Sequence, residues 1–165
     1  MEERLKFIFS NVNDWLKFAE GKLAGIIVFN GAILIGIMQI SKELGMIDWH
    51  IKNAIIVQIY SNIISLLVSF WGILPKIKRN KLNNKNQYQN DNLIFWGDIS
   101  KYDVDSFTQK FRTDFQYQEE PTAFEQRIIE QIIQNSKLNV RKNKLFKASL
   151  YITLIGLVIS LVFLL

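Results

Sequence analysis

Three stretches of the chain contain no charged side chain, and the longest runs from residue 54 to residue 74. These 21 residues (AIIVQIYSNIISLLVSFWGIL) would form a helix about 31 Å long, which matches a hydrocarbon core of roughly 30 Å. Residues 23–40 and 148–165 are also free of charge, with 18 residues each. The pattern therefore predicts three membrane spans.

The polar residues of the second predicted span recur at steps of three and four and share one helical face. They are Gln58, Ser61, Asn62, Ser65 and Ser69. A polar face within lipid has to meet another helix or water. Two interpretations follow: packing of helices through small hydroxyl groups, or a water-accessible seam in an oligomer.

The first predicted span carries Asn30 near its middle, followed by Gly31, and Ala32 and Gly36 form a pair of small residues four positions apart. Such pairs let another helix approach closely. A buried Asn requires a partner, and we expect either a hydrogen bond to Asn62 or Ser65 or a direct role in conduction or gating.

Residues 1–22 show the pattern of an amphipathic helix. Its apolar face is formed by Leu5, Ile8, Phe9, Val12, Trp15, Leu16 and Ala19. We expect this helix to lie in the membrane interface or against the cytosolic part of the protein.

Basic residues are concentrated beside the predicted spans. Residues 76–92 contain five basic side chains and one acidic side chain, and residues 137–147 contain five basic and none acidic. The positive-inside rule then places the N-terminus and residues 76–146 in the cytoplasm. These clusters are best explained by anionic lipid heads, and no nucleic acid partner is expected despite the net charge of +5.

Two helix starts are predicted within residues 76–146, after an apolar segment at residues 93–100 that we expect to fill the core. Asp103 or Asp105 can cap a helix bearing the aromatic residues Phe107, Phe111 and Phe115. Thr122 to Glu125 forms a capping box, and the helix after it is expected to run on into the third span. Its predicted buried residues are Phe124, Ile128, Ile129, Ile132 and Ile133.

Composition argues against most enzyme classes. The chain has no Cys and a single His50, which we expect to be exposed in the connection between the first two spans. Cysteine chemistry and His-cluster metal sites therefore have no residues to support them, and the sequence contains neither a GxGxxG nor a GxxxxGK[ST] phosphate-binding motif. We predict no catalytic residue, no metal and no cofactor.

Together these patterns predict an all-α membrane protein with three transmembrane helices and a small helical cytosolic domain between the second and third. The expected divisions are residues 1–22 (amphipathic helix), 23–75 (transmembrane hairpin), 76–146 (cytosolic linker and helical domain) and 147–165 (third span).

Three segments resemble one protein family. They are WLKFAEGKLAGIIVFNGAIL, NLIFWGDISKYDVDSF and KLNVRKNKLFKASL, and with the second span they cover nearly the whole chain. In this combination the sequence resembles the Pycsar membrane-effector (PycTM-like) domain. The most specific pieces are Asn30-Gly31-Ala32 and the segment from Asn92 to Ile99.

The resemblance implies an antiphage effector of the bacterial inner membrane that oligomerises and impairs the membrane when a cyclic pyrimidine mononucleotide is present. Effectors of cyclic-oligonucleotide systems would look much alike, so the ligand stays open. A phosphate would need Lys101, Arg112 or Arg127, and a base would need an aromatic residue such as Trp96, Tyr102 or Phe107. The alternative is a non-conducting membrane adaptor that scaffolds a cytosolic partner.

Overall fold

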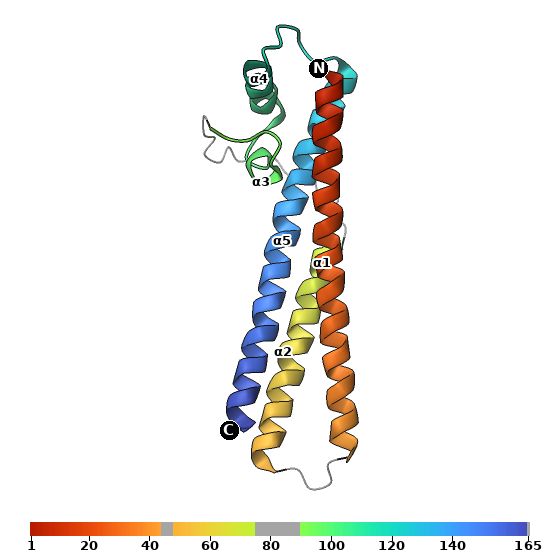
Figure 1. The fold of residues 1–165 in the computed structure, drawn as a ribbon, viewed down its shortest axis with the longest axis vertical. Helices are drawn as coiled ribbons and strands as arrows, with labels where there is room; N and C mark the ends of the chain where they lie inside the picture. The colour runs from red at the N-terminus through yellow and green to blue at the C-terminus, as the bar shows by residue number, and fades with distance from the viewer. Residues whose placement is uncertain (44–47, 75–89, 165) are drawn as a thin grey trace. The chain divides into compact units, whose positions relative to one another are not determined.

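The computed structural model describes residues 1–43, 48–74 and 90–164, and these residues form five helices and no strand. In chain order the helices are α1 (Glu2–Glu43), α2 (Trp49–Ile73), α3 (Trp96–Ile99), α4 (Val104–Phe115) and α5 (Ala123–Leu164) (Figure 1). The prediction of an all-α protein is confirmed. Three of the helices, α1, α2 and α5, are long and apolar enough to cross a membrane, as predicted.

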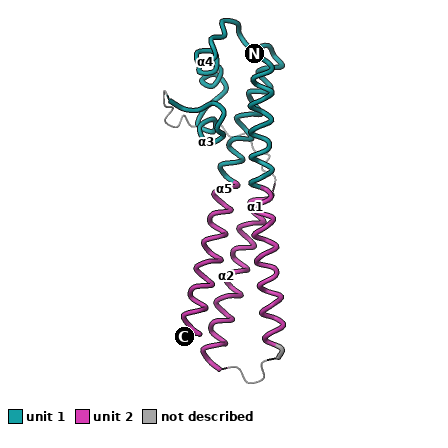
Figure 2. Tube along the Cα trace, viewed as in Figure 1, with its two compact units in different colours: residues 1–19, 75–141 teal, residues 20–74, 142–165 magenta. Residues whose placement is uncertain are grey.

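The chain divides into two compact units (Figure 2). Unit 1 comprises Met1–Ala19 and Pro75–Arg141, and unit 2 comprises Glu20–Leu74 and Lys142–Leu165. Helices α1 and α5 each contribute residues to both units. Most of the predicted basic linker, at residues 75–89, lies outside the described residues.

Two helix boundaries differ from the sequence-based expectation. The amphipathic segment and the first span form one helix, because no residue near position 22 interrupts helical hydrogen bonding and α1 continues to Glu43. Helix α2 begins at Trp49, so His50 lies in its first turn, exposed, and not in a loop.

The predicted helix starts are confirmed. Asp103 is the N-cap of α4, and its Oδ1 accepts a hydrogen bond of 2.8 Å from the backbone N–H of Ser106. Before α5, the backbone N–H of Thr122 donates to Glu125 Oε2 at 2.9 Å, and the backbone N–H of Glu125 donates to Thr122 Oγ1 at 3.3 Å. From this start α5 runs without a break to Leu164, which confirms the predicted continuous helix.

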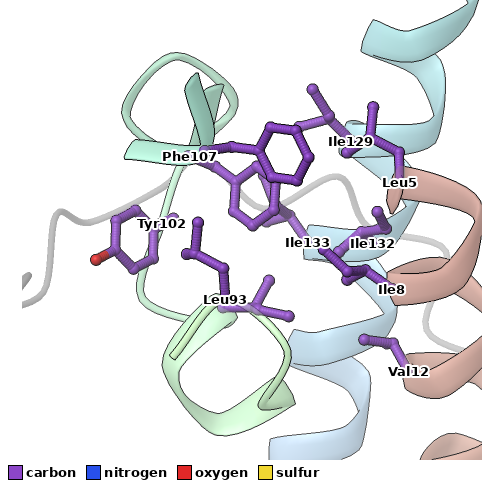
Figure 3. Close-up of a cluster of buried hydrophobic side chains, with 11 residues drawn as sticks. Leu5, Ile8, Val12, Leu93, Tyr102, Phe107, Ile129, Ile132 and Ile133 are labelled. Atoms are coloured by element: carbon purple, nitrogen blue, oxygen red, sulfur yellow. The ribbon is translucent and has the colours of Figure 1, made fainter. Parts of the chain in front are cut away.

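The core of unit 1 joins the start of α1 to α4, to the first part of α5 and to the segment around α3 (Figure 3). Phe107 and Phe111 are completely buried, as the predicted aromatic face of α4 requires. The rest of the buried core consists of Leu5, Ile8, Val12, Leu93, Ile99, Tyr102, Ile129, Ile132 and Ile133.

Phe124 is a correction to the predicted core. Its side chain is 57% exposed, whereas Ile129, five positions later, is fully buried. Five residues at 100° each place Phe124 about 140° away from Ile129 around the helix, so the two cannot share one face. Trp15, at the margin of the apolar face of α1, is also exposed, at 44%.

Unit 2 consists of the later part of α1, all of α2 and the later part of α5. Large apolar side chains such as Val28, Leu67 and Val158 are exposed on it, and its interior contains polar side chains. This arrangement is the one a lipid solvent favours, because polar groups must find partners inside the protein.

Close helix contacts in unit 2 occur at glycines of α2 and α5. A Cβ placed on Gly156 would lie 2.0 Å from Ser61 Oγ, and one on Gly72 would lie 2.9 Å from a methyl group of Leu23. By contrast, a Cβ on Gly36 would meet nothing within 4 Å in the described part of the chain. The small residues of α1 are therefore not what brings the helices of this chain together.

We predict that Gly156→Ala destabilises the protein by about 1–3 kcal/mol, because α5 has to move away from Ser61. Gly36→Ala is the matched control, since it makes the same change in another apolar helix and should be neutral or slightly stabilising. Thermal or denaturant unfolding of the three proteins in one detergent measures the difference. Equal stability of the two variants would contradict the close α2–α5 packing.

Candidate functional site

The side chains with a possible role in the membrane form one group inside unit 2, which we call the polar cluster. Each is at most 8% exposed. Helix α1 contributes one of these residues, α2 four and α5 three. The members are Asn30, Gln58, Asn62, Ser65, Ser69, Ser149, Thr153 and Ser160.

Ser149 is the centre of the polar cluster. Its Oγ lies 2.6 Å from Ser65 Oγ and 2.6 Å from Ser69 Oγ, and it can also donate to the backbone carbonyl of Ser65 at 2.9 Å. One short side chain of α5 thus contacts two consecutive turns of α2. Small hydroxyl groups permit this close approach.

Asn30 connects α1 to the same place. Its Nδ2 donates to Ser65 Oγ at 2.9 Å, which is one of the two hydrogen bonds that the sequence suggested for Asn30. Its Oδ1 lies 2.9 Å from Thr153 Oγ1, which can donate to it. All three long helices therefore meet through hydrogen bonds among Asn30, Ser65, Ser149 and Thr153.

A second group of bonds lies nearer the start of α2. Gln58 Nε2 donates to Asn62 Oδ1 at 3.3 Å, and Ser160 Oγ lies 3.1 Å from Gln58 Oε1. Ser61, which is half-buried, donates to the backbone carbonyl of Gln58 at 3.0 Å. The Nδ2 atom of Asn62 is buried and has no hydrogen-bond acceptor among the described residues.

The predicted polar face of α2 is thus used for packing within a single chain. The cluster residues of α5 were not singled out from the sequence, although Ser149, Thr153 and Ser160 recur at steps of four and seven on one face. A role of any of these residues in an oligomeric water path stays a prediction.

Two of the predicted ligand-binding aromatic residues belong to the core of unit 1. Tyr102 is 2% exposed and Phe107 is fully buried, with 6.3 Å between their ring centroids. Their faces are covered by other side chains of the chain, so they stabilise the fold. Trp96 is half-buried and packs against Phe95 at 5.0 Å.

Lys101 and Tyr102 both contact Asp91. Lys101 Nζ lies 2.8 Å from Asp91 Oδ1 and 2.7 Å from Asp98 Oδ1, and Tyr102 Oη donates to Asp91 Oδ2 at 3.0 Å. The hydrogen bonds to the two carboxylates raise the pKa of Lys101. Burial and the hydrogen bond to Asp91 raise the pKa of Tyr102 to about 12. A phosphate would have to compete with two carboxylates for Lys101.

The two predicted arginines differ in their surroundings. Arg112 forms an ion pair with Glu120 and donates to the backbone carbonyl of Gln118 at 2.6 Å. Arg127 is 74% exposed and pairs with Glu130 at 3.2 Å. Of the predicted phosphate ligands, Arg127 is therefore the one that solvent reaches most readily.

Arg4 is a further candidate that the sequence did not indicate. Its guanidinium carbon lies 5.0 Å from the ring centroid of Phe115 and 5.7 Å from that of Tyr117. Cation–π contact holds the guanidinium in place while its N–H groups stay at an exposed position. Periodicity could not reveal this contact, because it joins the first turn of α1 to the end of α4.

We predict that Asp91→Asn lowers the pKa of Tyr102 from about 12 toward its usual value near 10, because the carboxylate that stabilises the protonated phenol is lost. Absorbance at 295 nm during alkaline titration measures the change, and Tyr102→Phe identifies the late-titrating phenol.

The raised pKa of Tyr102 also predicts a pH dependence of stability. Because the folded state retains the phenol proton longer than the unfolded state, this contribution is complete below pH 10 and is lost as the pH rises to about 12. Unfolding measured across this window should show less alkaline destabilisation in Tyr102→Phe than in the unmodified protein. Parallel curves would contradict the raised pKa of Tyr102.

Comparison with known proteins adds one finding. A family model described as the Pycsar effector protein domain matches residues 4–165, nearly the whole chain. No curated protein and no solved structure matches the sequence.

Proposed function

The chain belongs to the Pycsar effector domain family, and from this premise we propose that it is a membrane effector of bacterial antiphage defence that oligomerises and impairs the inner membrane when it binds a cyclic nucleotide. The proposed ligand is a cyclic pyrimidine mononucleotide. Unit 1 is the proposed ligand-responsive part in the cytoplasm, and unit 2 is the proposed membrane part.

The observation that carries this proposal is the sharing of helices between the two units. Helices α1 and α5 each have one end in unit 1 and the other in unit 2. A ligand that favours one arrangement of unit 1 can therefore bias unit 2 through the helices themselves. It can do so only by binding that arrangement more tightly, at about 1.4 kcal/mol for each tenfold preference.

Arg4 and Arg127 are the proposed phosphate contacts. Both side chains are exposed, and an arginine can bind a phosphate through two parallel N–H groups. Lys101 and Arg112 are weaker candidates, because their ion-paired side chains are only 26% and 27% exposed, whereas Arg127, paired with Glu130, is 74% exposed. Trp96 is the proposed aromatic contact for a base, since Tyr102 and Phe107 are buried.

The proposal is tested with the purified protein in dye-loaded liposomes of phosphatidylethanolamine and phosphatidylglycerol. We expect leakage on adding cyclic UMP or cyclic CMP, and none with cyclic AMP or a cyclic dinucleotide. Leakage with one pyrimidine nucleotide only would identify the signal. If no nucleotide causes dye leakage although insertion of the protein is confirmed, the proposed function is contradicted.

The phosphate contacts are tested by titration calorimetry with the active nucleotide. Arg4→Ala and Arg127→Ala should each weaken binding at least tenfold if the residue holds the phosphate. Lys6→Ala is the control, because Lys6 is an exposed cation paired with Glu2 on the same helix. Equal affinity of the unmodified protein and the three variants would show that neither arginine binds the phosphate.

A second candidate function is the non-conducting adaptor, and the surface of unit 1 favours it. Six large apolar side chains of this unit are more than 40% exposed: Phe124, Phe7, Trp15, Phe18, Ile94 and Phe95. The hydrogen bond from Asn11 Nδ2 to the Ile94 carbonyl, 3.0 Å long, fixes the last two beside α1. Capture of a cytosolic partner without any change in membrane permeability would support the adaptor over the effector.

A further inference from the structure

The side chains able to line an aqueous path are turned into the interior of unit 2. Asn30, Asn62, Ser65 and Ser69 are buried, whereas large apolar side chains such as Val28 and Leu67 are exposed on this unit. Copies that associate in this arrangement would bring apolar surfaces together. Such contacts offer nothing that could replace the hydration of an ion or of a polar solute.

We propose that the described arrangement of unit 2 is the closed state of the effector and that the polar cluster is the latch that holds it closed. In the membrane-active state α2 separates from α5, and the cluster side chains turn to water or to neighbouring copies. This inference rests on the proposed function, because it assumes that the protein permeabilises a membrane.

Ser149 makes the latch specific to the contact between α2 and α5. Its hydroxyl group contacts Ser65 and Ser69 at 2.6 Å each, so separation of the two helices breaks both contacts together. Asn30 adds α1 through its bond to Ser65. In lipid no water can replace a lost hydrogen-bond partner of these groups. The closed state is therefore favoured until water or a neighbouring copy offers them new partners.

Asn62 destabilises the closed state. Its Nδ2 atom is buried in the closed state without an acceptor among the described residues, which is unfavourable in a medium of low polarity. Any arrangement that gives this amide water or a partner relieves the penalty. The same helix therefore carries groups that favour the closed state and one group that opposes it, which is what a switch with two accessible states requires.

The latch is tested by locking it covalently. The chain has no Cys, so Ser69→Cys with Ser149→Cys introduces the only two thiols. The two Oγ atoms lie 2.6 Å apart, close to the S–S bond length of about 2.05 Å, and the longer C–S bonds reduce the remaining gap. Disulfide formation is verified by intact mass, and the two single-Cys variants under the same oxidant are the controls.

We expect nucleotide-induced leakage to fall at least tenfold in the oxidised double variant and to return on reduction. Leakage that is equal before and after oxidation, with the disulfide confirmed, would overturn the latch while leaving the proposed function intact. If the unmodified and reduced proteins also stay silent with every nucleotide, the proposed function itself fails, and the latch fails with it.

A matched pair of substitutions gives an independent test. Asn30→Leu removes bonds between helices and should raise leakage without nucleotide several-fold. Asn62→Leu removes the unpaired Nδ2 group, together with a bond to Gln58 that lies within α2, and should raise the nucleotide concentration needed for leakage. Leakage is followed with both an encapsulated dye and a membrane-potential dye. If both variants leak more readily than the unmodified protein, or both leak less readily, the latch is contradicted.

Discussion

The arrangement of unit 2 depends on one constraint, which is that polar groups within a bilayer must be satisfied by the protein itself. In a soluble bundle the interior would be apolar and the surface polar. Here α2 turns Gln58, Asn62, Ser65 and Ser69 inward and leaves Ile63, Leu67 and Phe70 exposed. The hydrogen bonds around Ser149 then fix which residues of α2 and α5 face each other.

Unit 1 has an apolar core, in contrast to the polar cluster inside unit 2. Helices α1 and α5 take part in both units. The first part of α1 buries Leu5, Ile8 and Val12, while its later part buries Asn30 together with Leu23 and Ile26. Helix α5 likewise buries Ile129, Ile132 and Ile133 in unit 1 and then Ser149, Thr153 and Ser160 in unit 2. Among the described residues, the buried apolar side chains of α5 all lie in unit 1, whereas α1 buries apolar side chains in both units and adds one buried amide in unit 2.

The balance of satisfied and unsatisfied groups has consequences for function. A cluster in which every polar atom was paired would favour a single packing, and an entirely apolar interior would specify no register between helices. The observed interior of unit 2 lies between these limits. The hydroxyl group of Ser149 contacts two others, whereas the Nδ2 group of Asn62 has no acceptor among the described residues. In unit 1, Lys101 and Arg112 form ion pairs at partly buried positions, whereas Arg4 and Arg127 are exposed, Arg127 with an ion pair to Glu130.

The sequence by itself determined the three apolar helices, the polar face of α2 and the starts of α4 and α5, because length, periodicity and capping are local properties of the chain. The sequence also identifies the family, because the segments that resemble it are spread over nearly the whole chain. Only the tertiary structure decided that Phe124 is exposed, that Tyr102 and Phe107 belong to the core, and that Ser149 and Thr153 complete the polar cluster. These outcomes depend on which helices meet and at what rotation, and hydrogen bonds between residues 80 and 84 positions apart fix that rotation in unit 2.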